Sequence, residues 1–138
     1  MQLGMRGRAA PRLPAAAAAL LLLLALPAPA VAAPAPRAQQ EIAGLMAALA
    51  GSHCQFQRNG KWHDAAEARR HLQRKYDYLL KRNLVDSAEQ FIERAASSSS
   101  VSGREYRVRC AGQPERASAE WFGEQLRRQR AAGGTPGR

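Results

Sequence analysis

The chain has 138 residues, of which 46% are hydrophobic and 23% are charged, so its length fits one domain of ordinary size. It carries 21 Lys and Arg against 11 Asp and Glu, a formal net charge of +10. Three of these cations, Arg6, Arg8 and Arg12, lie in a first segment without acidic residues, and without them the balance is 18 − 11 = +7. Because arginine and alanine are both abundant, part of this charge reflects composition, and the charge alone identifies no partner.

Residues 1–32 have the layout of a secretory signal peptide. The basic residues precede an uninterrupted apolar run from Ala15 to Leu26, which Pro27 ends. We expect cleavage after Ala32, with Ala30 and Ala33 as the alternative sites. The apolar run is shorter than the ~20 residues that a membrane-spanning helix needs. We therefore expect an exported protein, periplasmic or secreted, without a transmembrane anchor after cleavage.

The two cysteines, Cys54 and Cys110, both follow the expected cleavage site. Cysteines of exported proteins meet an oxidising compartment, in which they pair. We expect a disulfide between them, and the alternative is two separate buried thiols.

Composition divides the remaining chain into one module with two irregular ends. Residues 33–40 are rich in proline and alanine, and residues 131–138 are rich in glycine, so we expect both segments to be disordered. Between them, residues 41–130 form a single domain without internal repeats. Its first helix is predicted from about Gln39 to Ala50, on one apolar stripe of Ile42, Leu45, Met46 and Leu49.

Asn59-Gly60, between two short runs, is a β-hairpin signal. A two-residue turn places Gln57 opposite Trp62 and sends Trp62 and Phe56 to opposite faces. A three-residue loop, with Gly60 in the left-handed conformation, places Phe56 opposite Trp62 instead. We favour the three-residue loop because it buries both aromatic rings on one face.

Capping residues and periodicity predict the other elements. Asp64 and Glu67 form a capping pattern for a helix from Ala65 to about Arg82, and Asp86 or Ser87 caps the next helix. A polar connection follows over residues 97–103. Alternation then predicts a half-buried strand over residues 106–110, which pairs with the hairpin, and after a turn over residues 112–116 Ser118 caps a last helix. The fold class is α+β: about four helices, a hairpin, one further strand and one disulfide.

Four blocks of residues carry a resemblance to a known family: SxCxFxRNGxW from Ser52, HLxxKYxY from His71, SAExFI from Ser87 and SxxSGxxYxVxC from Ser99. In this order they resemble a family of small exported bacterial proteins known only as a domain of unknown function. The similarity covers about Glu41 to Arg130. The resemblance implies export, the disulfide and a single domain, and it implies no activity, ligand or catalytic residue.

His71, Lys75, Tyr78 and Arg82 form a polar stripe along the second predicted helix. One interpretation is a binding surface for an anion, and the other is a solvated helix face beside the core. Residues of the hairpin and of the serine-rich connection are candidates to flank such a surface. The candidate binding residues are Arg58, Asn59, His71, Lys75, Tyr78, Ser99 and Ser102.

Other kinds of site have weaker patterns. A hydrolase would use a serine of residues 97–102 with His71 or Lys75 as base, but neither a Gly-x-Ser-x-Gly nor a Ser-x-x-Lys motif is present. The histidines and cysteines lack metal-ligand spacing, so we expect no metal and no other cofactor. Export argues against nucleic acid. The sequence favours a non-enzymatic binding or accessory module whose basic face meets an anionic envelope component or an acidic protein.

Overall fold

The computed structural model describes residues 4, 7, 9–12 and 33–134, and the account below concerns residues 33–134. The apolar run of the expected signal peptide, its cleavage site after Ala32 and residues 135–138 of the expected tail lie outside the described residues. Among those described, no helix combines the length and the apolar character needed to cross a bilayer.

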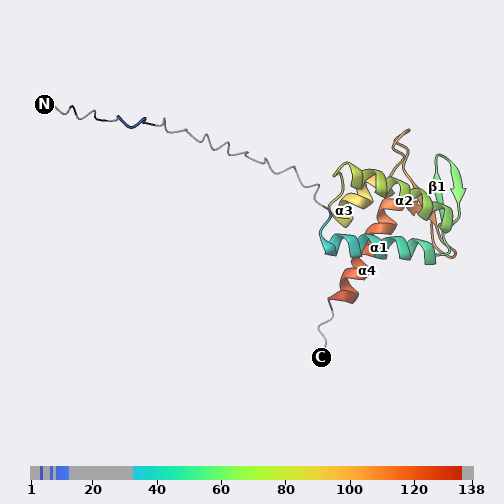
Figure 1. The fold of residues 1–138 in the computed structure, drawn as a ribbon. Coiled ribbons are helices and arrows are strands. Elements are labelled where there is room, and N and C mark those ends of the chain that lie inside the picture. The colour runs from blue at the N-terminus through green and yellow to red at the C-terminus, as the bar shows by residue number, and fades with distance from the viewer. Residues whose placement is uncertain (1–3, 5–6, 8, 13–32, 135–138) are drawn as a thin grey trace. The chain divides into compact units, whose positions relative to one another are not determined.

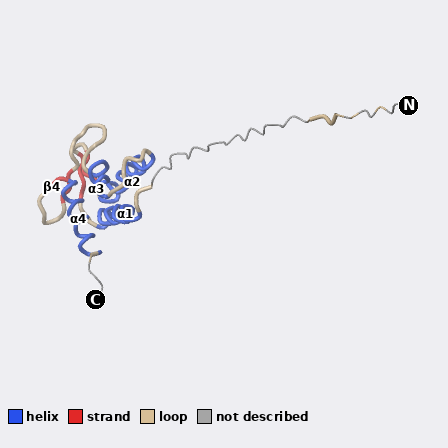
Figure 2. Tube along the Cα trace, turned by 90° about the vertical axis from the view of Figure 1, so that its left-hand side faces the viewer, coloured by secondary structure: helices blue, strands red, loops and turns tan. Residues whose placement is uncertain are grey.

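The domain has α+β architecture, as predicted (Figure 1). Its helices are α1 (Pro36–Gly51), α2 (Ala65–Lys81), α3 (Ala88–Phe91), the π-helical turn η1 (Ile92–Ala96) that continues α3, and α4 (Ser118–Gly133). Its strands are β1 (Gln55–Arg58), β2 (Lys61–His63), β3 (Arg107–Arg109) and β4 (Arg116–Ala117). They form one antiparallel sheet in the order β2-β1-β3-β4. In Figure 2 the strands lie to one side of α1, α2 and α3.

Helix α1 is longer than expected and begins inside the segment that we expected to be disordered. Pro36 opens it, because a first-turn residue needs no backbone donor and the fixed φ of proline suits the helix. Helix α4 likewise continues to Gly133. The expectation of disorder is therefore wrong for residues 36–40 and 131–133.

The hairpin has the register that we did not favour. Phe56 pairs with His63 and Gln57 with Trp62, across a two-residue turn in which Asn59 has φ 50° and Gly60 φ 80°. Positive φ at both turn residues defines the type I′ geometry, whose twist matches that of the strands. His63 is consequently buried on the face of Phe56, whereas Trp62 lies on the opposite face under the Arg109 guanidinium, 4.0 Å from the ring centroid.

The inner face of the sheet packs against α4. The ring of Phe56 meets that of Trp121 edge-on, with centroids 5.4 Å apart, and Val108 of β3 is also buried. The disulfide joins Cys54, just before β1, to Cys110, just after β3, with Cα atoms 4.4 Å apart. It ties together the two central strands, and it confirms the expected pairing.

Three helix starts were predicted from capping residues, and two are confirmed. The Asp64 carboxylate accepts from the backbone N–H of Glu67 at 2.8 Å, and the Ser87 hydroxyl accepts from that of Gln90 at 3.1 Å. The third start is wrong, because Ala117 is the N-cap of α4 and Ser118 is its first residue. The backbone N–H of Ser118 donates instead to the Tyr106 carbonyl at 2.8 Å, where the short strand β4, which we did not predict, leads into the helix.

Candidate functional site

A hollow of about 330 Å³ lies between α2, η1 and the loop that follows η1. We call it the basic hollow, and its lining residues are His71, Arg74, Lys75, Tyr78, Leu79, Arg94 and Ser100. Three of the predicted binding residues, His71, Lys75 and Tyr78, therefore share one concave surface. A solvated helix face beside the core would instead form a convex ridge, and the structure does not have such a ridge at these residues.

The amphipathic pattern of α2 sets this arrangement. Leu72 and Leu79 are buried in the core, which orients the helix. His71, Lys75 and Tyr78 follow at spacings of four and three residues and so occupy one adjacent face. Burial of Leu72 and Leu79 thus orients α2 so that its polar stripe lies beside the hollow.

One hydroxyl, that of Tyr106, connects His71 and Lys75. Tyr106 Oη lies 2.9 Å from His71 Nε2 and accepts from Lys75 Nζ at 3.3 Å. Lys75 Nζ also donates to the Ser98 carbonyl at 2.7 Å. The Lys75 ammonium therefore spans the gap between α2 and the loop after η1, and one of its three N–H groups remains for a ligand.

The proton positions follow from what each group can donate. An ammonium group only donates, so Tyr106 accepts from Lys75 and is left with its own O–H. We assign that O–H to His71 Nε2, which makes His71 the neutral tautomer protonated at Nδ1. In agreement, the pKa of His71 is lowered to about 4, mainly by burial and next by the positive charge of Arg58.

Lys75 is half-buried without a carboxylate to balance it. Burial, again followed by the charge of Arg58, lowers the pKa of Lys75 to about 8. Both causes disfavour the ammonium form, and an anion at the same place would favour it. The Lys75 ammonium therefore lacks a counter-ion in the described part of the chain.

The distribution of ion pairs extends this observation to the whole of α2. Within residues 33–134, the carboxylates of Glu41, Glu89, Glu105, Glu115 and Glu124 pair with arginines of α1, α4, β3 and β4. No cation of α2 has a carboxylate partner among these residues; they are Arg69, Arg70, Arg74, Lys75 and Lys81. All the Lys and Arg side chains of the helix that forms the hollow are therefore unpaired within residues 33–134.

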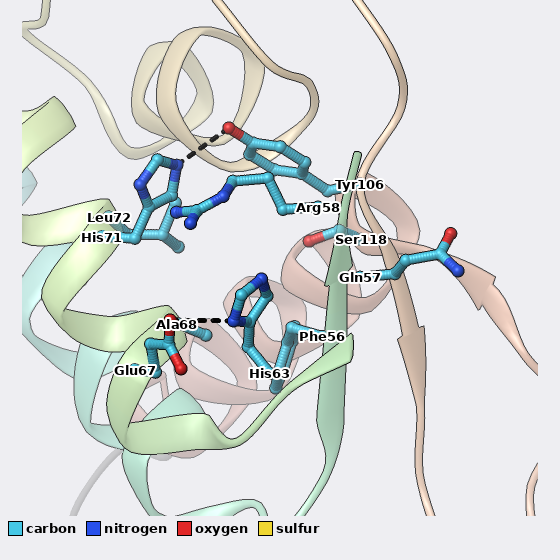
Figure 3. Close-up of a pocket in the computed structure, with 10 residues that line it drawn as sticks. All are labelled: Phe56, Gln57, Arg58, His63, Glu67, Ala68, His71, Leu72, Tyr106 and Ser118. Atoms are coloured by element: carbon cyan, nitrogen blue, oxygen red, sulfur yellow. Dashed lines mark hydrogen bonds and ion pairs between the residues drawn. The ribbon is translucent and has the colours of Figure 1, made fainter. Parts of the chain in front are cut away.

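A second, much smaller cavity shares His71 with the basic hollow (Figure 3). This inner cavity has a volume of about 30 Å³ and is lined mainly by residues of β1, β2 and α2. Figure 3 shows the Arg58 guanidinium extending toward His71, with the His63 ring below it. His63 Nδ1 lies 2.9 Å from the Glu67 carboxylate, which has its pKa lowered by this contact. The space suits about two water molecules and no larger ligand.

The remaining candidates do not line the basic hollow. Ser102 Oγ donates to Asn59 Oδ1 at 2.6 Å, so these two residues join the serine-rich loop to the hairpin turn. Ser99 is buried, and its hydroxyl accepts from the backbone N–H groups of Val101 and Ser102 at 3.3 and 3.2 Å. Both serines and Asn59 act as structural residues that shape the loop, and Arg58 belongs to the inner cavity.

The geometry gives no support to a serine nucleophile. Among the described residues, no serine hydroxyl forms a hydrogen bond with His71 or Lys75, and Lys75 bonds to the carbonyl rather than the hydroxyl of Ser98. A base must lie within hydrogen-bond reach of the proton that it removes. Across residues 33–134 there is also no cluster of three or more His, Cys, Asp or Glu residues with a metal-binding arrangement.

Sequence reasoning did not place Tyr106, Arg74 or Arg94 at the polar stripe, whereas Ser100 belongs to the serine-rich connection that it gave as a candidate flank. Tyr106 was assigned to the core by alternation, and its ring is indeed buried, but its hydroxyl reaches both His71 and Lys75. A tyrosine at a predicted core position was the available signal, because a buried phenol needs a hydrogen-bond partner. Arg94 gave no signal, since only the packing of η1 against α2 brings it to the hollow.

The chain belongs to a family of unknown function, DUF5329, whose model matches residues 36–130. It is similar to an uncharacterized protein, YfeK, of Salmonella typhimurium, with 42% identity over 69 residues. That match covers 49% of this chain and 56% of the relative, so the chain spans little more than half of the relative's length. No solved structure matches the chain significantly.

Proposed function

We propose that this member of the DUF5329 family is an exported, non-enzymatic binding module, and that its basic hollow holds the anionic group of a ligand. One observation carries the proposal: the Lys75 ammonium is half-buried in the wall of the hollow without a carboxylate partner in residues 33–134. Burying an unpaired charge costs free energy, and a bound anion offsets that cost.

The other groups of the hollow suit the same ligand chemistry. Arg74 and Arg94 add two guanidinium groups, which bind phosphate and carboxylate through paired N–H donors. His71 contributes a neutral ring whose Nδ1–H is a donor. A hollow lined by donors and cations accepts an anion and rejects a cation.

The test is a titration with inorganic phosphate followed by amide chemical shifts. We expect saturable shifts confined to α2, η1 and the loop after η1. Lys75→Gln should abolish them, whereas Lys81→Gln, which removes an exposed cation of the same helix, should leave them in place. Shifts that are linear in phosphate, or that weaken equally in both variants, would rule the site out.

The same titration has a pH dependence set by Lys75. Because the pKa of Lys75 is about 8, its charge is present below that pH and is lost above it. Phosphate affinity should therefore fall as the pH rises through about 8, and bound phosphate should move this midpoint upward, since it favours the ammonium. An affinity that is constant from pH 7 to about 9.5 would exclude Lys75 as the charge that holds the anion.

Export is supported by the disulfide and by the signal-peptide pattern of residues 1–32. Expression of the full chain in a Gram-negative bacterium tests it. The periplasmic fraction should hold an oxidised protein that begins at Ala33, or at Val31 or Pro34 if an alternative cleavage site is used. Retention of the full chain with free thiols in the cytoplasm would refute export.

A further inference from the structure

Each large hydrophobic side chain that is exposed within residues 33–134 belongs to a residue that lines the basic hollow, adjoins a lining residue in the chain or is hydrogen-bonded to one. These side chains are Tyr78, 53% exposed, Leu84, 40% exposed, and Val101, 98% exposed, and we call them the apolar rim. Tyr78 lines the hollow, and Val101 directly follows the lining residue Ser100. Leu84 is tied to two lining residues, because its N–H donates to the Leu79 carbonyl and its carbonyl accepts from the Arg94 side chain.

The position of Val101 is built into the fold. Its loop, between η1 and β3, projects from the domain in Figure 1. Ser99 holds the loop from inside: its backbone N–H donates to the Arg104 carbonyl at 2.9 Å, and its hydroxyl accepts from Val101 N–H. Ser102 ties the loop to Asn59 of the hairpin. An ordered loop thus holds an apolar side chain in solvent, and covering that side chain would gain free energy.

Charge surrounds these apolar groups. Arg74, Lys75 and Arg94 line the hollow, and the Arg82 guanidinium lies over the Tyr78 ring, 3.8 Å from its centroid. The acidic residues closest in sequence to the rim residues are Asp77, Asp86 and Glu105, all exposed, and the Glu105 carboxylate pairs with Arg107. The Asp77 carboxylate is engaged by the Gln73 amide at 2.9 Å, and the lining of the hollow itself contains no acidic residue.

A surface that combines exposed apolar groups with cations is suited to bind an anionic bilayer. Aliphatic side chains enter the acyl boundary, tyrosine rings prefer the headgroup level, and each nearby Lys or Arg gains about 1 kcal/mol from the surface potential. A soluble anion or an acidic polymer would use the cations and leave the apolar rim exposed. We infer that the anion in the basic hollow is a lipid headgroup phosphate, and that this face docks on an anionic bilayer with Val101 inserted. This inference rests on the proposed function.

The experiment is flotation of the full chain, matured by export, with two kinds of vesicle: pure phosphatidylcholine, and phosphatidylcholine with about one third phosphatidylglycerol. We expect binding to the anionic vesicles only. Val101→Asp should lower the partition coefficient at least about tenfold, because it removes the valine that inserts into the bilayer and adds a charge of the same sign as the lipid headgroups. Ala111→Asp adds the same charge at an exposed position beside Cys110 and should change binding about fivefold at most. Val101→Trp should strengthen binding.

The outcomes separate this inference from the proposed function. If Val101→Asp and Ala111→Asp weaken vesicle binding equally, or if pure phosphatidylcholine binds as well, docking by this face is wrong. If the wild-type protein shows the phosphate shifts described above but never floats with vesicles, the hollow binds a soluble or polymeric anion and only the lipid inference fails. If neither phosphate nor vesicles bind, both fail.

Discussion

The Tyr106 hydroxyl is shared by His71 and Lys75, and the behaviour of both side chains depends on it. It accepts from the Lys75 ammonium and lies within hydrogen-bond distance of the His71 ring. Burial raises the pKa of Tyr106, so the phenol stays protonated and keeps a proton for His71. The neutral histidine and the buried lysine are therefore two ends of one hydrogen-bonded chain.

Tyr106→Phe should destabilise the domain by about 1 to 2 kcal/mol, because the change leaves His71 Nε2 and one N–H of the half-buried Lys75 ammonium without a partner. Tyr76→Phe is the matched control: Tyr76 packs edge-on against Phe91, and its hydroxyl forms no hydrogen bond within residues 33–134. Denaturant unfolding of both variants measures the difference. Equal stability losses would show that the shared hydroxyl contributes nothing.

His71 also predicts how stability depends on pH. Its pKa is about 4 in the folded state against an ordinary value of 6.5, so between these pH values the unfolded chain binds a proton that the folded chain does not. Stability should therefore fall as the pH drops from about 6.5 to 4. Because the ring is only half-buried, solvent screens part of the effect, and we expect a loss of about 1 to 2 kcal/mol.

The check on this is unfolding of His71→Gln across the same pH range. The variant should lose this part of the pH dependence, whereas His53→Gln, which removes an exposed histidine outside both cavities described here, should keep it. The same slope in the wild-type protein and in His71→Gln would assign it to other groups.

At the scale of elements, local chemistry predicted the helices better than the turns between strands. Asp64 with Glu67 marked the start of α2, and the stripe of Ile42, Leu45 and Leu49 marked α1, because caps and periodicity act within a few residues. The hairpin register was wrong because burial of both rings was weighed above turn geometry. Asn-Gly adopts two positive φ angles readily, and Arg109 provides Trp62 with a partner on the outer face.

That turn yields a prediction with an internal control. Gly60→Ala places a side chain at φ 80° and should destabilise the domain by about 1 to 2 kcal/mol. Gly51→Ala, at the last residue of α1 where an added Cβ meets open space, should be neutral or stabilise by up to about 1 kcal/mol. Thermal and denaturant unfolding compare the two, and a neutral Gly60→Ala would mean that the turn relaxes to another geometry.

At the scale of the whole molecule, only part of the candidate site could be predicted, because long-range packing brings its other residues together. Periodicity placed His71, Lys75 and Tyr78 on one face of α2, which is a local inference. Tyr106 follows His71 by 35 positions and reaches it only through the pairing of β3 with β1 and the packing of α2 beside them. Arg94 and Ser100 come from η1 and its loop in the same way. A sequence pattern identifies the residues that share one face of a helix, and the tertiary fold determines which residues of other elements lie against that face.

The disulfide was predictable from the expected export to an oxidising compartment and from the number of cysteines. Its effect on stability also belongs to the scale of the whole molecule. Cys54 and Cys110 are 56 positions apart, so the bond closes more than half of the domain into one loop. In the chain-entropy description such a loop stabilises the folded state by about 4 kcal/mol. For a domain of roughly 100 residues this is a large fraction of a total of about 5 to 15 kcal/mol.

Replacing both residues, Cys54→Ala with Cys110→Ala, should therefore lower the free energy of unfolding by about 3 to 5 kcal/mol. The wild-type protein unfolded under full reduction should give a similar value, because both species lack the same cross-link while only one has lost the sulfur atoms. Agreement between the two assigns the loss to the constraint on the unfolded chain. If only the alanine variant is destabilised, the packing of Cys54, which is 5% exposed in the core, is responsible instead.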